Sequence, residues 1–171
     1  MTVRTGHILD EKQRGSIRLK AAIFTINTKL YQEKKDSPAT VVLKRILGQA
    51  GLEVRAGALP EERDVISAVM KQLAENHSVQ LILTVGANGF QKQDCAPDAL
   101  CDAVERLLPG IPEAMRAYHM RSSRKMVLDC SRAGICENTL IVNLPGNSKL
   151  AKEGLEYVLP EIMQVVEALN L

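Results

Sequence analysis

Apolar residues in this chain form short runs that alternate with amphipathic stretches. The runs KAAIFTIN (20–27) and VQLILTV (79–85) are largely apolar and are bounded by polar residues. This pattern is typical of strands that are buried on both faces of a sheet. LEVRAGAL (52–59) alternates more weakly and predicts a further strand.

Helical spacing of apolar residues separates these strands. One helix is predicted to begin at Pro38, with Ser37 as its N-cap, and to end at Gly51. A second is predicted from residues 61 to 76, and the polar stretch 28–37 predicts a loop. Strands that alternate with helices in this way predict an α/β fold with a largely parallel sheet.

The last third of the chain predicts an antiparallel strand. MVLDCSRAGIC (126–136) and TLIVNLPG (139–146) are strand-like runs on either side of a polar pair at 137–138. Two such runs around a short turn predict a hairpin, which places one antiparallel strand in the sheet.

Helices are also predicted in this part of the chain. Two lie near residues 97–108 and 112–124, and a longer one runs from 148 to 170. Pro160 falls inside the long helix and predicts a bend or an interruption there.

Length and composition favour a single globular domain. A chain of 171 residues suffices for one buried core, which we place at residues 19–171 behind a polar N-terminal arm of residues 1–18. Hydrophobic residues make up 46% and charged residues 25%, which is ordinary for a globular protein. A net charge of +2 and an aromatic content of 3% favour neither nucleic acid nor a membrane surface as partner.

No export signal is visible in the sequence. The first twenty residues lack the apolar core of a secretory signal, and no apolar run approaches the roughly 20 residues of a membrane span. We therefore expect a cytoplasmic protein with reduced thiols. The cysteines show no CxxC spacing, which argues against a zinc site. They are Cys95, Cys101, Cys130 and Cys136.

Two loops lie where a strand passes into a helix, the position at which α/β sheets bind ligands. TVGANG (84–89) contains glycines that let backbone N–H groups approach an anion, although the motif taken alone favours an ordinary turn. NLPGNSK (143–149) presents a helix N-terminus and Lys149. This second loop is either an anion site or a turn with a solvated lysine.

A third loop carries carboxylates. ALPEE (58–62) places Glu61 and Glu62 at the start of a helix. They either complement the helix dipole or, in the sharper interpretation, one of them joins Asp94 in holding Mg²⁺.

Four segments together resemble the MoaB/Mog family of molybdenum-cofactor biosynthesis proteins. TVGANGFQKQDCAPDA (84–99) resembles the family's TTGGTG…RDVTPDA stretch, and PGIPEAMR (109–116) resembles its PGF-x-E-x-MR segment. SRAGI (131–135) and TLIVNLPGNSK (139–149) resemble its SRA-x-x-G and LPG-x-P-K signatures. The segments occur in the family's order, and the resemblance extends from about Leu19 to the end of the chain.

The resemblance implies a fold and an activity. The family's fold is a three-layer α/β/α sandwich with a mixed five-stranded sheet, and its members are commonly homotrimers or hexamers. It implies binding of molybdopterin and, in the catalytic branch, adenylylation of that pterin with Mg-ATP before molybdate insertion. The partners implied are therefore a pterin and a nucleotide.

The resemblance also implies a set of site residues. Asp94 and Glu61 are implied as the catalytic carboxylates that hold Mg²⁺. The residues that match the family's ligand-binding segments are Gly86, Asn88, Gly89, Ser131, Arg132, Gly134, Pro145, Gly146, Asn147, Ser148 and Lys149.

Departures from the family pattern fall mainly in the glycine loop. Val85 and Ala87 stand where the family has glycine, Gln93 replaces an arginine, and Glu61 replaces an aspartate. We expect the added side chains to weaken nucleotide binding, while the LPG loop is intact. Two functions follow: a molybdopterin adenylyltransferase, or a non-catalytic molybdopterin-binding homologue with an eroded nucleotide loop.

Overall fold

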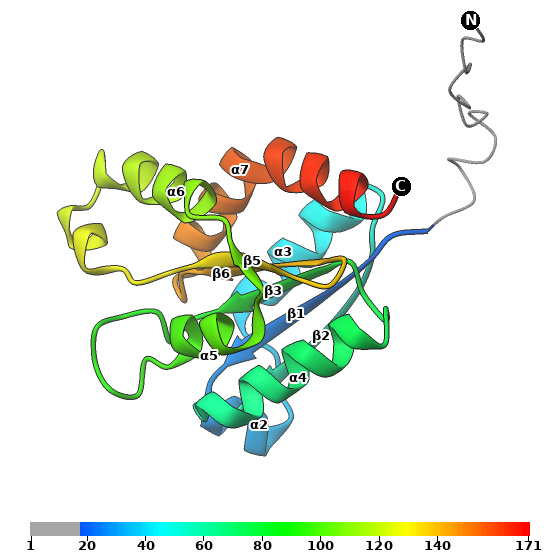
Figure 1. Ribbon diagram of the computed structural model, residues 1–171. Helices are drawn as coiled ribbons and strands as arrows, with labels where there is room; N and C mark the ends of the chain where they lie inside the picture. Colours follow the sequence, from blue (N-terminus) through cyan, green and yellow to red (C-terminus); the bar gives the residue numbers. More distant parts are fainter. Residues whose placement is uncertain (1–17) are drawn as a thin grey trace, which may run out of the picture.

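A computed structural model describes residues 18–171, so most of the predicted N-terminal arm lies outside the described residues. Its centre is a six-stranded sheet with the strand order β2-β1-β3-β6-β5-β4 (Figure 1). The strands are β1 (Lys20–Ile26), β2 (Glu53–Leu59), β3 (Leu81–Val85), β4 (Arg106–Leu107), β5 (Ala133–Cys136) and β6 (Thr139–Leu144).

The strand directions confirm a mostly parallel sheet with one antiparallel strand. β2, β1, β3 and β6 pair in parallel, while β5 runs antiparallel to both β6 and β4. The predicted hairpin is the β5–β6 pair. The sheet has six strands rather than the expected five because Arg106 and Leu107 pair with Ile135 and Gly134 at the edge of the sheet.

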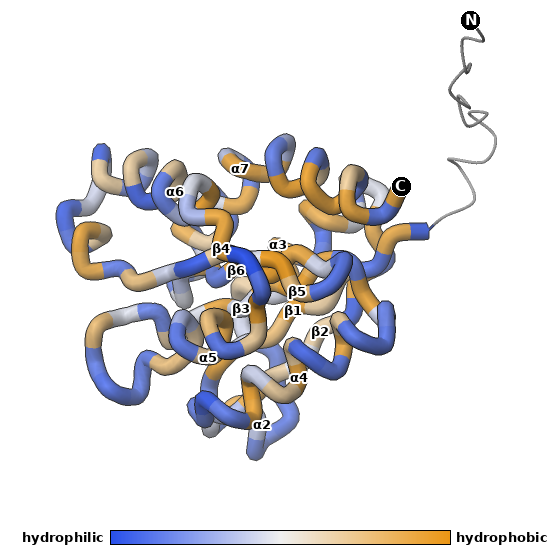
Figure 2. The backbone as a smooth tube through the Cα atoms, viewed as in Figure 1, coloured by the Kyte–Doolittle hydropathy of each residue, from blue (hydrophilic) through white to orange (hydrophobic). Residues whose placement is uncertain are grey.

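Helices cover both faces of the sheet and complete the expected three-layer sandwich (Figure 1). One face carries α3 (Pro38–Gln49), α6 (Gly110–Met120) and α7 (Ser148–Leu169), and the other carries α4 (Arg63–Glu75) and α5 (Ala96–Ala103). Each face of the sheet has its own hydrophobic core. Neighbouring residues of β1 point to opposite faces, so that Ile23 packs in the core beside α3, α6 and α7 and Ala22 in the core beside α4 and α5. Figure 2 shows hydrophobic positions concentrated along the sheet and on the helix faces turned toward it.

Several predicted elements differ in the structure. The polar stretch after β1 contains a short helix, α2 (Thr28–Glu33), because the Asn27 side chain accepts a hydrogen bond from the amide of Leu30 at 2.9 Å and caps it. The helix predicted at 97–108 ends at Ala103, because the chain then extends into β4.

The end of the chain shows two further differences. The helix predicted at 112–124 ends at Met120, and a 3₁₀ helix follows at Arg124–Leu128. α7 runs without interruption through Pro160. Pro160 and Glu156, whose carbonyl loses its usual amide donor, are both exposed, so water can satisfy that carbonyl. In the described part of the chain, no helix has the length and apolar character needed to cross a membrane.

Candidate functional site

The predicted site loops lie along one edge of the sheet. Because β1, β2, β3 and β6 are parallel, their carboxyl ends share that edge. β5 runs in the opposite direction, so the segment that precedes it, with Ser131 and Arg132, begins at the same edge. This is the edge at which open α/β sheets bind ligands.

The glycine loop and the LPG loop contact each other through their backbones. Gly86 has φ +90°, and its amide donates to the Leu144 carbonyl at 3.0 Å. A side chain at Gly146 would place its Cβ 3.3 Å from the Gly86 Cα. Glycine at both positions therefore allows the two loops to form one continuous backbone surface.

Asn88 anchors the glycine loop and leaves one acceptor unused. The residue is 5% exposed, and its side-chain amide donates to the Leu144 carbonyl at 2.6 Å. Its backbone carbonyl accepts from the amide of Cys130 at 2.7 Å. Its Oδ1 has no hydrogen-bond partner within residues 18–171. A buried acceptor without a partner is costly, which makes Oδ1 a candidate to receive an N–H group of a ligand.

The two departures from glycine in this loop have different structural consequences. Val85 is the last residue of β3 and is 1% exposed within the hydrophobic core. The expectation that its side chain obstructs the loop is therefore wrong. Ala87 does lie in the loop and has φ +57°, the left-handed conformation that favours glycine.

Asp94 is held within its own loop. Its Oδ2 accepts a hydrogen bond from the amide of Gln91 at 3.1 Å. A Cβ at Gly89 would lie 2.5 Å from the same oxygen. The absence of a side chain at Gly89 thus allows the carboxylate to fold back against the loop.

Glu61 connects two neighbouring loops. Its amide donates to the Thr28 hydroxyl at 3.0 Å, and its Oε1 accepts from the Thr28 amide at 3.3 Å.

Burial chiefly raises the pKa of the Cys95 thiol, and the charges of Glu61, Asp98 and Asp94 raise it further. The two predicted carboxylates thus act in the same direction on the pKa of one buried thiol.

The segment before β5 is fixed by ionic and polar contacts. The Arg116 guanidinium donates to the Asp129 carboxylate at 3.1 Å and to the Ser131 carbonyl at 3.0 Å. The hydroxyl of Ser131, which is 2% exposed, donates to the other Asp129 oxygen at 2.8 Å. The Arg132 amide donates to the side chain of buried Asn143 at 3.0 Å, whereas its own side chain is exposed. Arg132 is thus an exposed cation in this segment.

The N-terminus of α7 lies at the same edge. The Asn147 side chain accepts from the amide of Leu150 at 3.1 Å. The amides of Ser148 and Lys149 remain open in the described structure, and the Lys149 side chain is exposed. Pro145 is buried directly before this turn. Open amides, the helix dipole and a lysine together favour an anion.

Comparison with known proteins identifies the family. A family model described as "Probable molybdopterin binding domain" matches residues 22–164. The chain belongs to this family. The expected MoaB/Mog membership is confirmed by the relatives and structures that share the fold.

Relatives at moderate identity carry related names. A molybdopterin adenylyltransferase from Helicobacter pylori strain J99 is 32% identical over 116 residues, which cover 68% of this chain and 66% of that enzyme. The molybdenum cofactor synthesis protein cinnamon of Drosophila melanogaster is 28% identical over 133 residues, which cover 77% of this chain and 22% of that protein. The match therefore spans only part of these relatives.

Solved structures match over nearly the full described chain. The molybdopterin biosynthesis enzyme MoaB from Thermus thermophilus is 31% identical, with a TM-score of 0.79 and coverage of 88% of this chain and 96% of that chain. A molybdopterin biosynthesis protein from Mycobacterium abscessus is 26% identical, with a TM-score of 0.80 and coverage of 88% and 95%.

The residues that fit a metal in this MoaB/Mog domain are few. Within residues 18–171, no group of three or more histidine, cysteine, aspartate or glutamate side chains is placed to hold an ion. Mg²⁺ is commonly bound by one or two carboxylates together with substrate phosphates. Asp94 and Glu61 are carboxylates of this type, and each accepts a hydrogen bond from a backbone amide, of Gln91 and of Thr28 respectively.

One residue implied by the family resemblance has a clear packing role. Gly134 lies on β5, and a Cβ there would stand 2.8 Å from the Arg106 carbonyl and from the Val104 side chain. Its lack of a side chain allows β4 to pair with β5.

Two residues of the site were not predicted from the sequence. Asp129 and Asn143 position Ser131 and Arg132. The sequence signal for Asn143 is that it is a polar residue in the apolar run TLIVNL.

Proposed function

We propose that this chain takes part in molybdenum-cofactor biosynthesis by binding molybdopterin at the carboxyl edge and transferring an adenylyl group to it from Mg-ATP. The observation that carries the proposal is the joined surface of Gly86 and Gly146 beside the open N-terminus of α7. Two anionic ligands, a pterin phosphate and a nucleotide, need such a surface. The names of the relatives support this choice of substrates.

In this proposal the chain binds and orients the reactants and supplies no nucleophile. An oxygen of the pterin phosphate attacks the α-phosphorus of ATP, and pyrophosphate leaves. Lys149 and Arg132 offset the phosphate charges, and Asn88 Oδ1 accepts a hydrogen bond from the ligand. Mg²⁺ held by Asp94 and Glu61 would neutralise charge on the departing pyrophosphate. Phosphoryl transfer of this kind rests on positioning and electrostatic stabilisation.

The second candidate function is binding of molybdopterin without turnover. Ala87 favours it, because its methyl group occupies a left-handed loop position at which family members carry glycine. In that case the pterin binds at α7 while ATP binds weakly. We also propose, on the family likeness, that the chain assembles as a homotrimer.

Removal of one charge tests the anion site. We expect Lys149→Ala to weaken molybdopterin binding by about 1–3 kcal/mol, as for the loss of a charge-assisted hydrogen bond. Calorimetric titration measures the change. Lys152→Ala is the matched control, because Lys152 lies on the same helix and pairs with Glu156 at 4.0 Å. If Lys149→Ala binds molybdopterin as tightly as Lys152→Ala does, the pterin phosphate lies elsewhere.

A further inference from the structure

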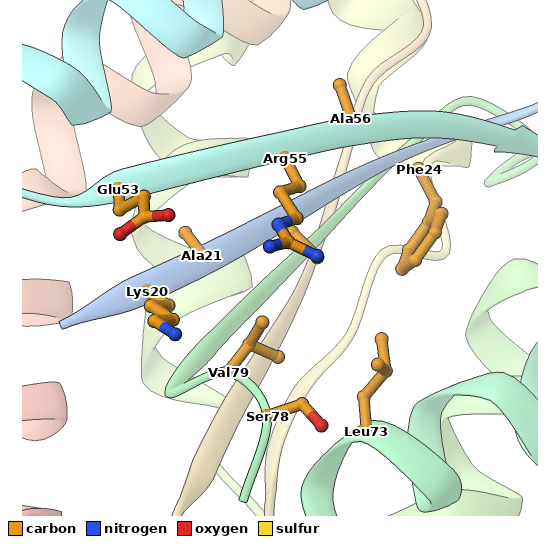
Figure 3. A pocket seen from close by; sticks show the side chains of 10 residues that line it. Lys20, Ala21, Phe24, Glu53, Arg55, Ala56, Leu73, Ser78 and Val79 are labelled. Atoms are coloured by element: carbon orange, nitrogen blue, oxygen red, sulfur yellow. The ribbon is translucent and has the colours of Figure 1, made fainter.

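A pocket of about 450 Å³ lies away from the carboxyl edge, beside the amino ends of β1 and β2 (Figure 3). It is lined by residues of those two strands, by Leu73 of α4, and by Ser78 and Val79 in the segment that enters β3. Ligand pockets commonly measure about 300–1,000 Å³, so its volume suits a small organic molecule. None of the predicted site residues lines it.

The pairing register of β1 and β2 creates this space. On the α4 face, Ala22 lies opposite Arg55 and Phe24 lies opposite Gly57. Each large side chain thus has a small partner across the strands. A Cβ at Gly57 would lie 4.0 Å from the Phe24 ring. The small partners leave volume over the sheet that neither strand fills.

Apolar side chains form the walls of the pocket. Figure 3 shows Phe24 extending from β1 toward Leu73, which rises from α4, with Val79 beside the space between them. Val79 is 6% exposed and belongs to the core on this face. A flat apolar group would lie between Phe24 and Leu73 with contacts on both sides.

The polar end of the pocket carries two cations, Lys20 and Arg55, and one carboxylate, Glu53, which lies opposite Lys20 in the strand register. Figure 3 shows the Arg55 side chain extending into the space from β2, and Lys20 also lines it. Within residues 18–171 neither side-chain cation has an ion-pair partner, whereas Glu53, the carboxylate of the lining, lies 3.7 Å from Arg18. Two cations beside an apolar wall complement an anion with an apolar body.

We propose that this pocket binds a small organic anion with a planar apolar body, of the aromatic carboxylate or sulfonate class. The planar body lies between Phe24 and Leu73, and the anionic group bonds the Arg55 guanidinium with support from Lys20. This site is independent of the adenylyl-transfer proposal, because it uses the opposite end of the strands.

Titration with naphthalenesulfonate and with neutral naphthol tests the proposal. Both probes carry the same planar body, and only the first carries a charge. Methyl NMR spectra of the whole protein should show shifts at Leu73 and Val79, with the sulfonate bound about tenfold or more tightly than naphthol. Absence of shifts at these methyl groups, or equal affinity for the two probes, would overturn the proposal.

Two variants separate charge from folding. Arg55→Gln should lower sulfonate affinity about tenfold and leave naphthol affinity unchanged. Arg45→Gln, on an exposed position of α3, is the control and should change neither. Unchanged sulfonate affinity in Arg55→Gln would show that the guanidinium does not hold the anion and would refute the proposal.

Discussion

Ala87 holds an unfavourable backbone conformation in the loop that follows β3. Its φ of +57° places a side chain in the left-handed region, and its carbonyl accepts from the Ala96 amide at 3.1 Å, which ties the loop to the start of α5. For a residue with a Cβ this conformation costs roughly 1–2 kcal/mol. The loop thus keeps the shape that suits glycine while carrying alanine.

Replacing this alanine should relieve the strain. We expect Ala87→Gly to raise the free energy of unfolding by up to about 1 kcal/mol, because the strain removed exceeds the added chain entropy of glycine. Urea unfolding measures the change. Ala68→Gly, at an exposed position inside α4, should instead lose about 1 kcal/mol. If both variants lose the same free energy of unfolding, Ala87 is not strained.

At the residue scale, the sequence allowed prediction of those residues that belong to short motifs. Gly86, Gly146 and Asp94 could be named from the sequence because their loops keep the family's order, and their roles toward a ligand stay predictions. Val85 was rightly placed at the end of the buried strand 79–85, but its side chain was wrongly counted as part of the loop that follows. The contact of Asp129 with Arg116 depends on the tertiary packing of α6, which no local pattern encodes.

At the scale of elements, the contact between α6 and α7 contains a buried histidine. His119 of α6 is fully buried, and a Cβ at Gly154 of α7 would lie 3.0 Å from its Nε2. Burial lowers the pKa of His119, against smaller raising effects of Glu153, the Leu150 backbone and Asp129. The folded protein therefore keeps this imidazole neutral below its ordinary pKa of 6.5.

This contact predicts a loss of stability in acid. Below about pH 6.5 the unfolded chain takes up a proton at His119 that the folded chain resists, so the free energy of unfolding should fall as the pH drops. Urea unfolding between about pH 7 and 5 measures this slope. His119→Leu should flatten it, and His77→Asn, at an exposed residue with φ +52°, should preserve it. An unchanged slope in His119→Leu would show that protonation of His119 does not cause the loss of stability.

The elements that sequence patterns missed share a physical cause. α2 buries none of its residues, so it has no apolar stripe, and it depends on capping by Asn27. β4 has only two residues. They are extended because they pair with β5 at the edge of the sheet, although the surrounding sequence has helical spacing. The long apolar strands and α7 were predicted because burial imposes a period on their residues.

At the scale of the whole molecule, the two proposed sites lie at opposite ends of the strands of the sheet. The carboxyl edge joins the glycine loop, the LPG loop and α7, and the amino ends of β1 and β2 open into the cationic pocket. Parallel pairing of β2, β1, β3 and β6 separates the two.

The proposed homotrimer also concerns the whole molecule. We expect light scattering at micromolar concentration to give the mass of a homotrimer. A value of 18.8 kDa, the mass of one chain, would contradict the proposed assembly.

Release of pyrophosphate from Mg-ATP on addition of molybdopterin tests for adenylyl transfer. We expect one pyrophosphate for each adenylylated pterin found by mass spectrometry. We also expect the rate to be about a hundredfold lower in Asp94→Asn, because electrostatic stabilisation is lost. Asp98→Asn, at an exposed position in the first turn of α5, should keep the wild-type rate. Tight binding of molybdopterin without any pyrophosphate release would exclude adenylyl transfer and make the chain a non-catalytic binding protein.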